Sequence, residues 1–194
     1  MAALAVAATC ILVAMAETRV GWAADEISPD RQASILVRAL AYNRNLKTQA
    51  GDDFVLAVVY QRNNTASEEC GRDAVAAFRG FEKFVMEGLP FRVAPISYES
   101  ASAMNHTLTR DGVDAVYVCG GLDSELDAIA TLAQERKAVS IGALREYVTR
   151  KLSLGVFIND GEPRILVNLP ESKREGADFG SDFLRLATLV EDAK

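Results

Sequence analysis

Two cysteines are the residues whose type and spacing most clearly suggest chemistry. The sequence contains three cysteines, and Cys10 lies in an apolar N-terminal stretch that we expect to be removed. Cys70 and Cys119 then remain as an even pair, which in an oxidising compartment predicts one disulfide; the alternative is two buried thiols. A bridge between them would close a loop of about 50 residues and stabilise the fold by roughly 4 kcal/mol.

A second candidate is the turn that contains Gly120, Gly121 and Ser124. Two glycines between a strand and a helix are typical of a turn whose backbone N–H groups bind a phosphate. The dinucleotide fingerprint and the P-loop pattern are both absent, and Asp123 would repel an anion. A tight structural turn is therefore the main interpretation, and a ligand-binding turn is the alternative.

The single histidine, His106, limits the catalytic possibilities. One histidine cannot form a histidine-based metal cluster, and a Ser–His–Asp or Cys–His site would have to use it. No strained nucleophile turn lies near it, so we expect a solvated residue on a helix. We predict no catalytic residue, no metal site and no cofactor, and therefore a protein that is not an enzyme.

The N-terminal residues 1–16 are apolar and carry no charged side chain. Their length suits the core of a signal peptide better than a membrane-spanning helix. We predict a signal peptide over residues 1–24, cleaved after Ala16 or near Ala23, and a single domain over residues 25–194; the alternative is a buried N-terminal helix. The protein is thus expected in the bacterial periplasm, without a membrane span of its own. The net charge of −6 argues against nucleic acid as a partner.

Along the rest of the chain, strand patterns alternate with helix patterns. We expect strands over residues 54–60, 91–96, 115–119 and 138–141. The helices expected around them cover residues 28–49, 70–85, 100–110, 122–133 and 143–151, and residues 61–69 are expected to be a polar loop. Two further strands, residues 154–158 and 164–169, flank Asp160-Gly161, which is a hairpin signal. A last helix is expected over residues 183–190.

This alternation predicts a three-layer α/β domain with a mostly parallel sheet of the flavodoxin or Rossmann type. The expected order across the sheet is second, first, third, fourth, as in flavodoxin, with the hairpin as an antiparallel edge and right-handed crossovers. Cys70 follows the first strand and Cys119 ends the third, so both would lie at the carboxyl edge of neighbouring strands. A bridge there would close the crevice in which such sheets bind ligands, which favours a protein-binding role.

The C-terminal third carries a more specific pattern. A glycine-containing strand (residues 154–158) is followed by the Asp160-Gly161 turn and by a strand that ends in Asn168-Leu169. A short basic helix over residues 171–175 and a closing helix from residue 181 come next. In these features the chain resembles the YfiR-like family of periplasmic proteins. It differs from that family in its first helix, which lacks the usual aromatic residues, and in the absence of a second cysteine pair.

The resemblance implies a non-enzymatic regulator. Such a protein binds the periplasmic part of an inner-membrane diguanylate cyclase and holds it inactive, which lowers cyclic-di-GMP signalling and biofilm formation. The resemblance also implies that redox state, through disulfides, affects this repression. A small-ligand receptor with an open crevice near Gly120 and Gly121 is the second hypothesis. The sequence leaves open whether the protein is a monomer or a homodimer.

Overall fold

An eight-stranded sheet organises residues 27–190, the part of the chain that the computed structural model describes. The predicted signal peptide and its two cleavage sites lie outside these residues. The strand order is β2-β3-β1-β4-β5-β6-β7-β8. The strands are β1 (Phe54–Gln61), β2 (Val85–Met86), β3 (Leu89–Tyr98), β4 (Ala115–Val118), β5 (Val139–Gly142), β6 (Leu154–Asn159), β7 (Glu162–Val167) and β8 (Thr188–Leu189).

The centre of the sheet is parallel and its C-terminal side is mixed. Strands β3, β1, β4, β5 and β6 run in one direction, which confirms the predicted order of the first four sequence strands. The β6–β7 pair is an antiparallel hairpin whose turn, Asp160-Gly161, has the positive φ angles that such tight turns require. The mostly parallel α/β fold with a C-terminal hairpin is therefore confirmed.

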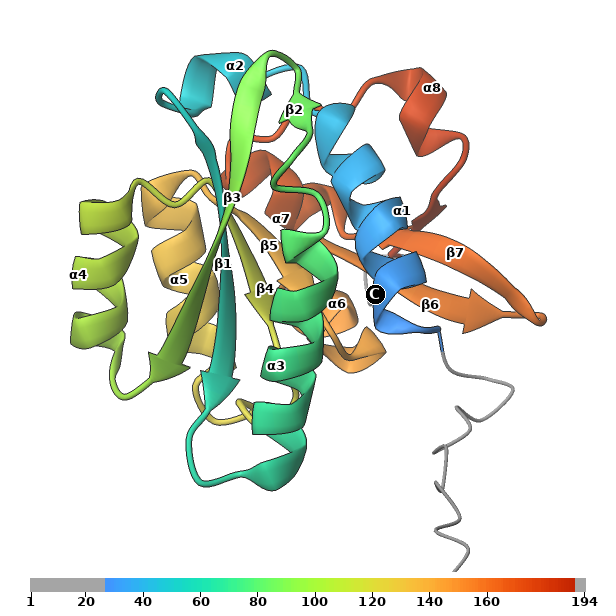
Figure 1. The fold of residues 1–194 in the computed structure, drawn as a ribbon. Coiled ribbons are helices and arrows are strands. Elements are labelled where there is room, and N and C mark those ends of the chain that lie inside the picture. Colours follow the sequence, from blue (N-terminus) through green and yellow to red (C-terminus); the bar gives the residue numbers. More distant parts are fainter. Residues whose placement is uncertain (1–26, 191–194) are drawn as a thin grey trace, which may run out of the picture.

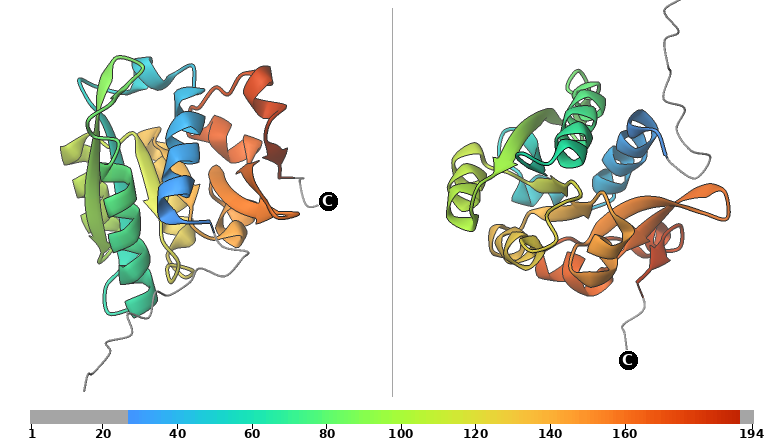
Figure 2. Two further views of the ribbon diagram at one scale, coloured as in Figure 1. Left: turned by 45° about the vertical axis from the view of Figure 1, so that its right-hand side comes forward. Right: turned by 90° about the horizontal axis from the view of Figure 1, so that it is seen from below.

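Helices cover both faces of this sheet (Figure 2). Alternate side chains of β1 point to opposite faces: Leu56 and Val58 join a core with α1 and α3, whereas Val55 and Ala57 join a core with α4, α5 and α6. The helices are α1 (Pro29–Ala41), α2 (Leu46–Gln49), α3 (Thr65–Arg79), α4 (Ala101–Asp111), α5 (Leu126–Arg136), α6 (Arg145–Arg150), α7 (Leu169–Arg174) and α8 (Ser181–Leu184). Within residues 27–190, no helix has the length and apolar character to cross a bilayer.

Helix α3 begins earlier and ends earlier than the sequence predicted. The expected loop over residues 61–69 is wrong from Thr65 onward, because the Asn64 side chain caps the helix by accepting the Ser67 N–H at 3.2 Å. The helix ends at Arg79 rather than near residue 85. Residues that were expected to extend it form β2 instead, which pairs with β3 through a turn at Glu87-Gly88.

The predicted helix over residues 183–190 is also wrong. Helix α8 ends at Leu184, and Thr188–Leu189 form β8, which pairs with Leu166 and Val167 of β7. Phe183 is the residue of this segment that enters the core, whereas Leu186 is 67% exposed. The apolar residues that predicted a helix face therefore include one fully buried residue, Phe183, and two partly buried ones, Leu184 and Ala187, that pack against the core.

Candidate functional site

The two cysteines lie together at the carboxyl edge of the parallel strands. Cys119 is the residue after β4 and is buried, whereas Cys70 is partly exposed and lies inside α3 rather than at the expected start of that helix. The two thiols hydrogen-bond to each other, and the structure holds both as free thiols. The predicted contact between distant parts of the chain is therefore present, and the disulfide itself stays a prediction.

The surroundings of the pair make the two thiols chemically unequal. The hydrogen bond with Cys119 is the largest effect on Cys70 and lowers the pKa of its thiol, against burial, which raises it; the Gly120 N–H and the Tyr117 hydroxyl also lower it. The same contact with Cys70, together with burial, raises the pKa of the Cys119 thiol. Cys70 is thus the thiol that ionises first, and the thiolate is the reactive form.

A cavity of about 640 Å³ opens beside Cys70. It lies where the parallel strands end, between α1, α3, β4 and β6, and the strand arrows of β1 and β3 point toward this end of the molecule (Figure 1). Cys70 is part of its wall. The structure holds no bridge, and a cavity remains beside the two free thiols, so closure of the crevice by a bridge stays a prediction.

Gly120 and Gly121 line this cavity, but their backbone is used within the protein. The Gly120 N–H bonds to Cys70, and Tyr147 takes hydrogen bonds from the N–H groups of Gly121 and Leu122, the latter at 2.9 Å. Ser124 is exposed and is not part of the cavity wall. The arrangement is that of a tight structural turn, in which Gly121 has a φ of +86° that suits glycine.

Sequence reasoning missed a polar connection inside the cavity. The Tyr117 hydroxyl donates to the Gln32 side-chain oxygen at 2.7 Å, and the Gln32 amide donates to the Val156 carbonyl at 3.3 Å. These bonds join β4, α1 and β6. The signal for Tyr117 was its position two residues before Cys119 in a strand, since alternate strand residues share a face. Gln32 carried no comparable signal.

The profile of the YfiR/HmsC-like family (DUF4154) matches residues 30–188, which is most of the chain. The chain belongs to the YfiR/HmsC-like family. Members of this family are periplasmic regulators. No curated protein matches the chain.

Three solved structures share the fold of this YfiR/HmsC-like chain, each over 86% of its length. One is a ligand-free, open substrate-binding protein with adhesive properties from Clostridium difficile, with 16% identity and a TM-score of 0.59. The others are an ABC domain bound to L-Trp from Streptococcus pneumonia (14%, TM-score 0.59) and a conserved domain protein from Vibrio cholerae (12%, TM-score 0.59). The chain spans 61–63% of the length of these proteins, and at such identities the likeness concerns the fold alone.

The single histidine lies away from the cysteine pair, on a different helix. His106 lies exposed on α4, as expected. In the described part of this YfiR/HmsC-like chain, no group of three histidine, cysteine or acidic side chains is placed to hold a metal ion.

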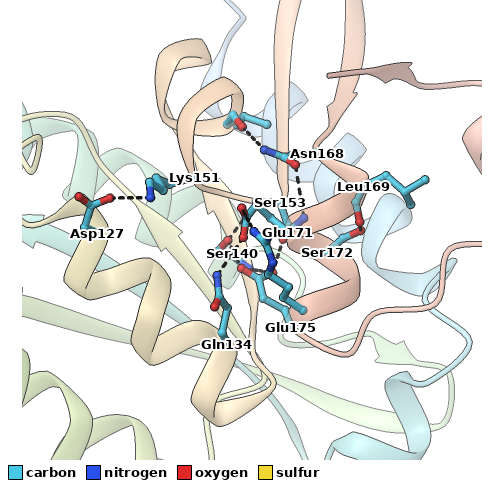
Figure 3. A network of polar contacts seen from close by, with 12 residues as sticks. Asp127, Gln134, Ser140, Lys151, Ser153, Asn168, Leu169, Glu171, Ser172 and Glu175 are labelled. Atoms are coloured by element: carbon cyan, nitrogen blue, oxygen red, sulfur yellow. Dashed lines mark hydrogen bonds and ion pairs between the residues drawn. The ribbon is translucent and has the colours of Figure 1, made fainter. Parts of the chain in front are cut away.

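A buried polar network forms at the face of the sheet covered by α5 and α7 (Figure 3). Glu175, at the end of α7, has no exposed surface, and its carboxylate accepts hydrogen bonds from the Ser140 N–H at 2.9 Å and from the hydroxyls of Ser140 and Ser153. Burial raises the pKa of Glu175 to about 7. Ser140 lies in β5, Ser153 directly precedes β6 and Glu175 directly follows α7, so the network fixes the end of α7 to the sheet.

Proposed function

We propose that this chain is a periplasmic regulatory protein that binds an inner-membrane diguanylate cyclase and holds it inactive. Membership of the YfiR/HmsC-like family supports a regulatory role in the periplasm. The apolar residues 1–16 support export. In this function the protein lowers cyclic-di-GMP production and biofilm formation by contact with its partner.

The observation that carries the partner-binding role is an exposed apolar surface at the C-terminal end of α1, which we call the α1-end surface. Tyr42, Phe84 and Val85 are each more than half exposed there, at 51%, 56% and 66%. A groove of about 200 Å³ beside Phe84 and a second hollow of about 360 Å³ beside Tyr42 share Ala41 and Glu87 in their walls, so the surface is continuous. Clusters of exposed large apolar side chains mark interaction sites.

The position of this surface suits a protein partner rather than a small molecule. It lies at the end of the molecule formed by α2, β2 and α8, away from the carboxyl ends of β1 and β3 (Figure 1). Tyr42 stacks on Phe183 with ring centroids 5.2 Å apart, so its ring is held in place by the core. A rigid exposed aromatic side chain can contribute binding energy at low cost in conformational entropy.

The test is co-purification of the exported, tagged protein with inner-membrane proteins. Phe84→Ser is expected to abolish recovery of the cyclase and to raise cellular cyclic-di-GMP. Leu189→Ser is the matched control, because Leu189 is also an exposed apolar residue but lies on β8, at the opposite edge of the sheet from β2. Normal repression by Phe84→Ser and by Tyr42→Ser, or the absence of any cyclase among the recovered proteins, would refute the proposal.

The cavity beside Cys70 supports a second candidate function, that of a small-ligand binding module. Its volume of about 640 Å³ falls within the range of known ligand sites. Similar folds occur in a substrate-binding protein and in an ABC domain bound to L-Trp. A regulator can bind a small ligand as its signal and a membrane protein as its target, so the two functions are compatible. A thermal-shift screen against metabolites tests this function: stabilisation by one compound class supports it, and a flat response across the screen opposes it.

The disulfide between Cys70 and Cys119 is the remaining proposal for the oxidising periplasm. It is supported by the contact between the two thiols and by their unequal pKa values. Oxidation of the pair would remove the Cys70 thiol from the cavity wall. A free-thiol titration of the exported, denatured protein decides the matter, since two titratable thiols would rule the bridge out.

A further inference from the structure

The cavity beside Cys70 has a wall that suits a mainly apolar ligand. Aromatic side chains reach it from three elements: Phe78 of α3, Tyr117 of β4 and Phe157 of β6. Aliphatic side chains add to this wall: Ile27, Pro29, Ala74, Leu144, Val156 and Ile158. Such walls with a few polar groups are typical of sites that enclose small organic molecules.

Most neutral polar groups of the wall are already satisfied within the protein. Tyr117 donates to Gln32, and Gln32 donates to the Val156 carbonyl, so both side chains are engaged. The Asn64 side-chain oxygen accepts the Ser67 N–H, and the Gly120 N–H bonds to Cys70. The wall therefore does not offer the set of free N–H donors that an anion requires.

The charge of the cavity wall indicates whether a cationic, neutral or anionic ligand is favoured. Asp73 is the only charged residue among the described residues that line the cavity; no lysine, arginine or histidine lines it. The Asp73 side chain is 45% exposed, and its contact with Arg72 is long, at 4.0 Å. A carboxylate at the edge of an apolar cleft, paired only by this long contact to a residue outside the cavity wall, attracts cations and repels phosphates and carboxylates.

We propose that this cavity binds a small organic cation with an apolar, preferably aromatic, body. The ammonium group pairs with Asp73, and the apolar body packs against Phe78, Tyr117 and Phe157. The inference rests on the second candidate function, that the cavity receives a small ligand. It does not depend on the membrane partner.

The experiment compares three probes with one skeleton on the purified, reduced mature protein by calorimetry and NMR. The probes are 2-phenylethylamine, 2-phenylethanol and 3-phenylpropanoate. The amine is expected to bind about fivefold more tightly than the alcohol, the fold-change that one partly exposed ion pair supplies, and the carboxylate more weakly than both. Asp73→Asn is expected to reduce the amine to the affinity of the alcohol.

Two further variants make the outcome decisive. Glu69→Gln is the matched control, because Glu69 lies one turn earlier on α3, contacts the same Arg72 at 3.9 Å and is outside the cavity wall; its amine affinity should be unchanged. Ala66→Phe changes an exposed wall residue and should block all probes by filling the cavity. Equal binding of amine and alcohol would overturn the charge assignment while leaving a ligand cavity. No binding of any probe at millimolar concentration, or binding that survives Ala66→Phe, would overturn the ligand cavity as well.

Discussion

The backbone N–H of Ser140 donates a hydrogen bond of 2.9 Å to the Glu175 carboxylate, which lies in the protein interior without any exposed surface. No lysine or arginine side chain bonds to this carboxylate among the described residues; its partners are the hydroxyls of Ser140 and Ser153. Uncharged donors offset only part of the cost of burying a carboxylate.

The first prediction is that this arrangement makes stability fall as pH rises. The pKa of Glu175 is raised from 4.5 to about 7, so the folded state holds the proton more tightly than the unfolded state. Its contribution is complete below pH 4.5 and is lost as the pH rises through about 7. Between these limits the wild type should lose about 3 kcal/mol relative to Glu175→Gln, which does not titrate.

Urea unfolding of both proteins across this pH range measures the difference. Comparison with the variant is necessary because burial also raises the pKa of Asp114, to about 6. Asp114 is present in both proteins, so its contribution cancels. Parallel pH profiles of the wild type and Glu175→Gln would contradict the assignment.

The second prediction concerns thiol reactivity in the reduced protein. Cys70 should react with iodoacetamide much faster than Cys119, since its thiol has the lowered pKa and is partly exposed. Cys119→Ala should slow the alkylation of Cys70 severalfold near neutral pH, because the main hydrogen bond that lowers this pKa is lost. Mass spectrometry of timed alkylation measures both rates, and faster labelling of Cys119 would be the opposite of the expected result.

The third prediction concerns the proposed disulfide. The oxidised protein should be more stable than the reduced protein by roughly 4 kcal/mol, and this gain should vanish in Cys70→Ser. Urea denaturation with and without reductant measures the gain. Cys119→Ser serves as the second insensitive control. If the urea midpoint of the wild type does not change with reductant, the pair stays reduced or the bridge is strained.

The fourth prediction concerns the glycine turn beside the cavity. An added Cβ at Gly121 would lie 2.5 Å from the Asn64 side-chain nitrogen, at a φ of +86°, so Gly121→Ala should cost about 1–3 kcal/mol. Part of this cost arises because Asn64 cannot move without weakening its cap on α3.

Gly112→Ala is the control for this turn. Gly112 also has a positive φ, +61°, but an added Cβ there meets no atom within 4 Å. Gly112→Ala should therefore lower the stability only by the cost of a positive φ angle for alanine, about 1 kcal/mol. Thermal unfolding of the two variants gives the comparison. Equal losses would show that the Asn64 contact does not restrict the turn.

Most of the sheet could be predicted from sequence because its longer strands have clear local sequence patterns. Residues 54–60 form a continuous apolar run, which indicates a strand covered on both faces, and Asp160-Gly161 indicates a hairpin. The order of the central strands was predicted from the flavodoxin-like arrangement that alternating strands and helices favour. The contact between Cys70 and Cys119 followed from that order.

Other features depend on contacts that no local pattern contains. The first turn of α3 is polar on its outer side and buries Ser67, so apolar periodicity does not show it. The two residues of β8 are a strand only because they pair with β7. The cavity owes its shape to a contact between Gln32 and Val156, which lie 124 positions apart.

Helix α1 reaches both proposed sites. Its first turns supply Pro29 and Gln32 to the cavity wall, and its last turn supplies Ala41 to the α1-end surface. Thirteen helical residues make a rod about 20 Å long. A ligand that displaces the Gln32 side chain would break its hydrogen bonds to Tyr117 and to the Val156 carbonyl, which join α1 to β4 and β6. Because Tyr42 follows directly on this helix, α1 is a continuous connection between the proposed ligand cavity and the proposed partner surface.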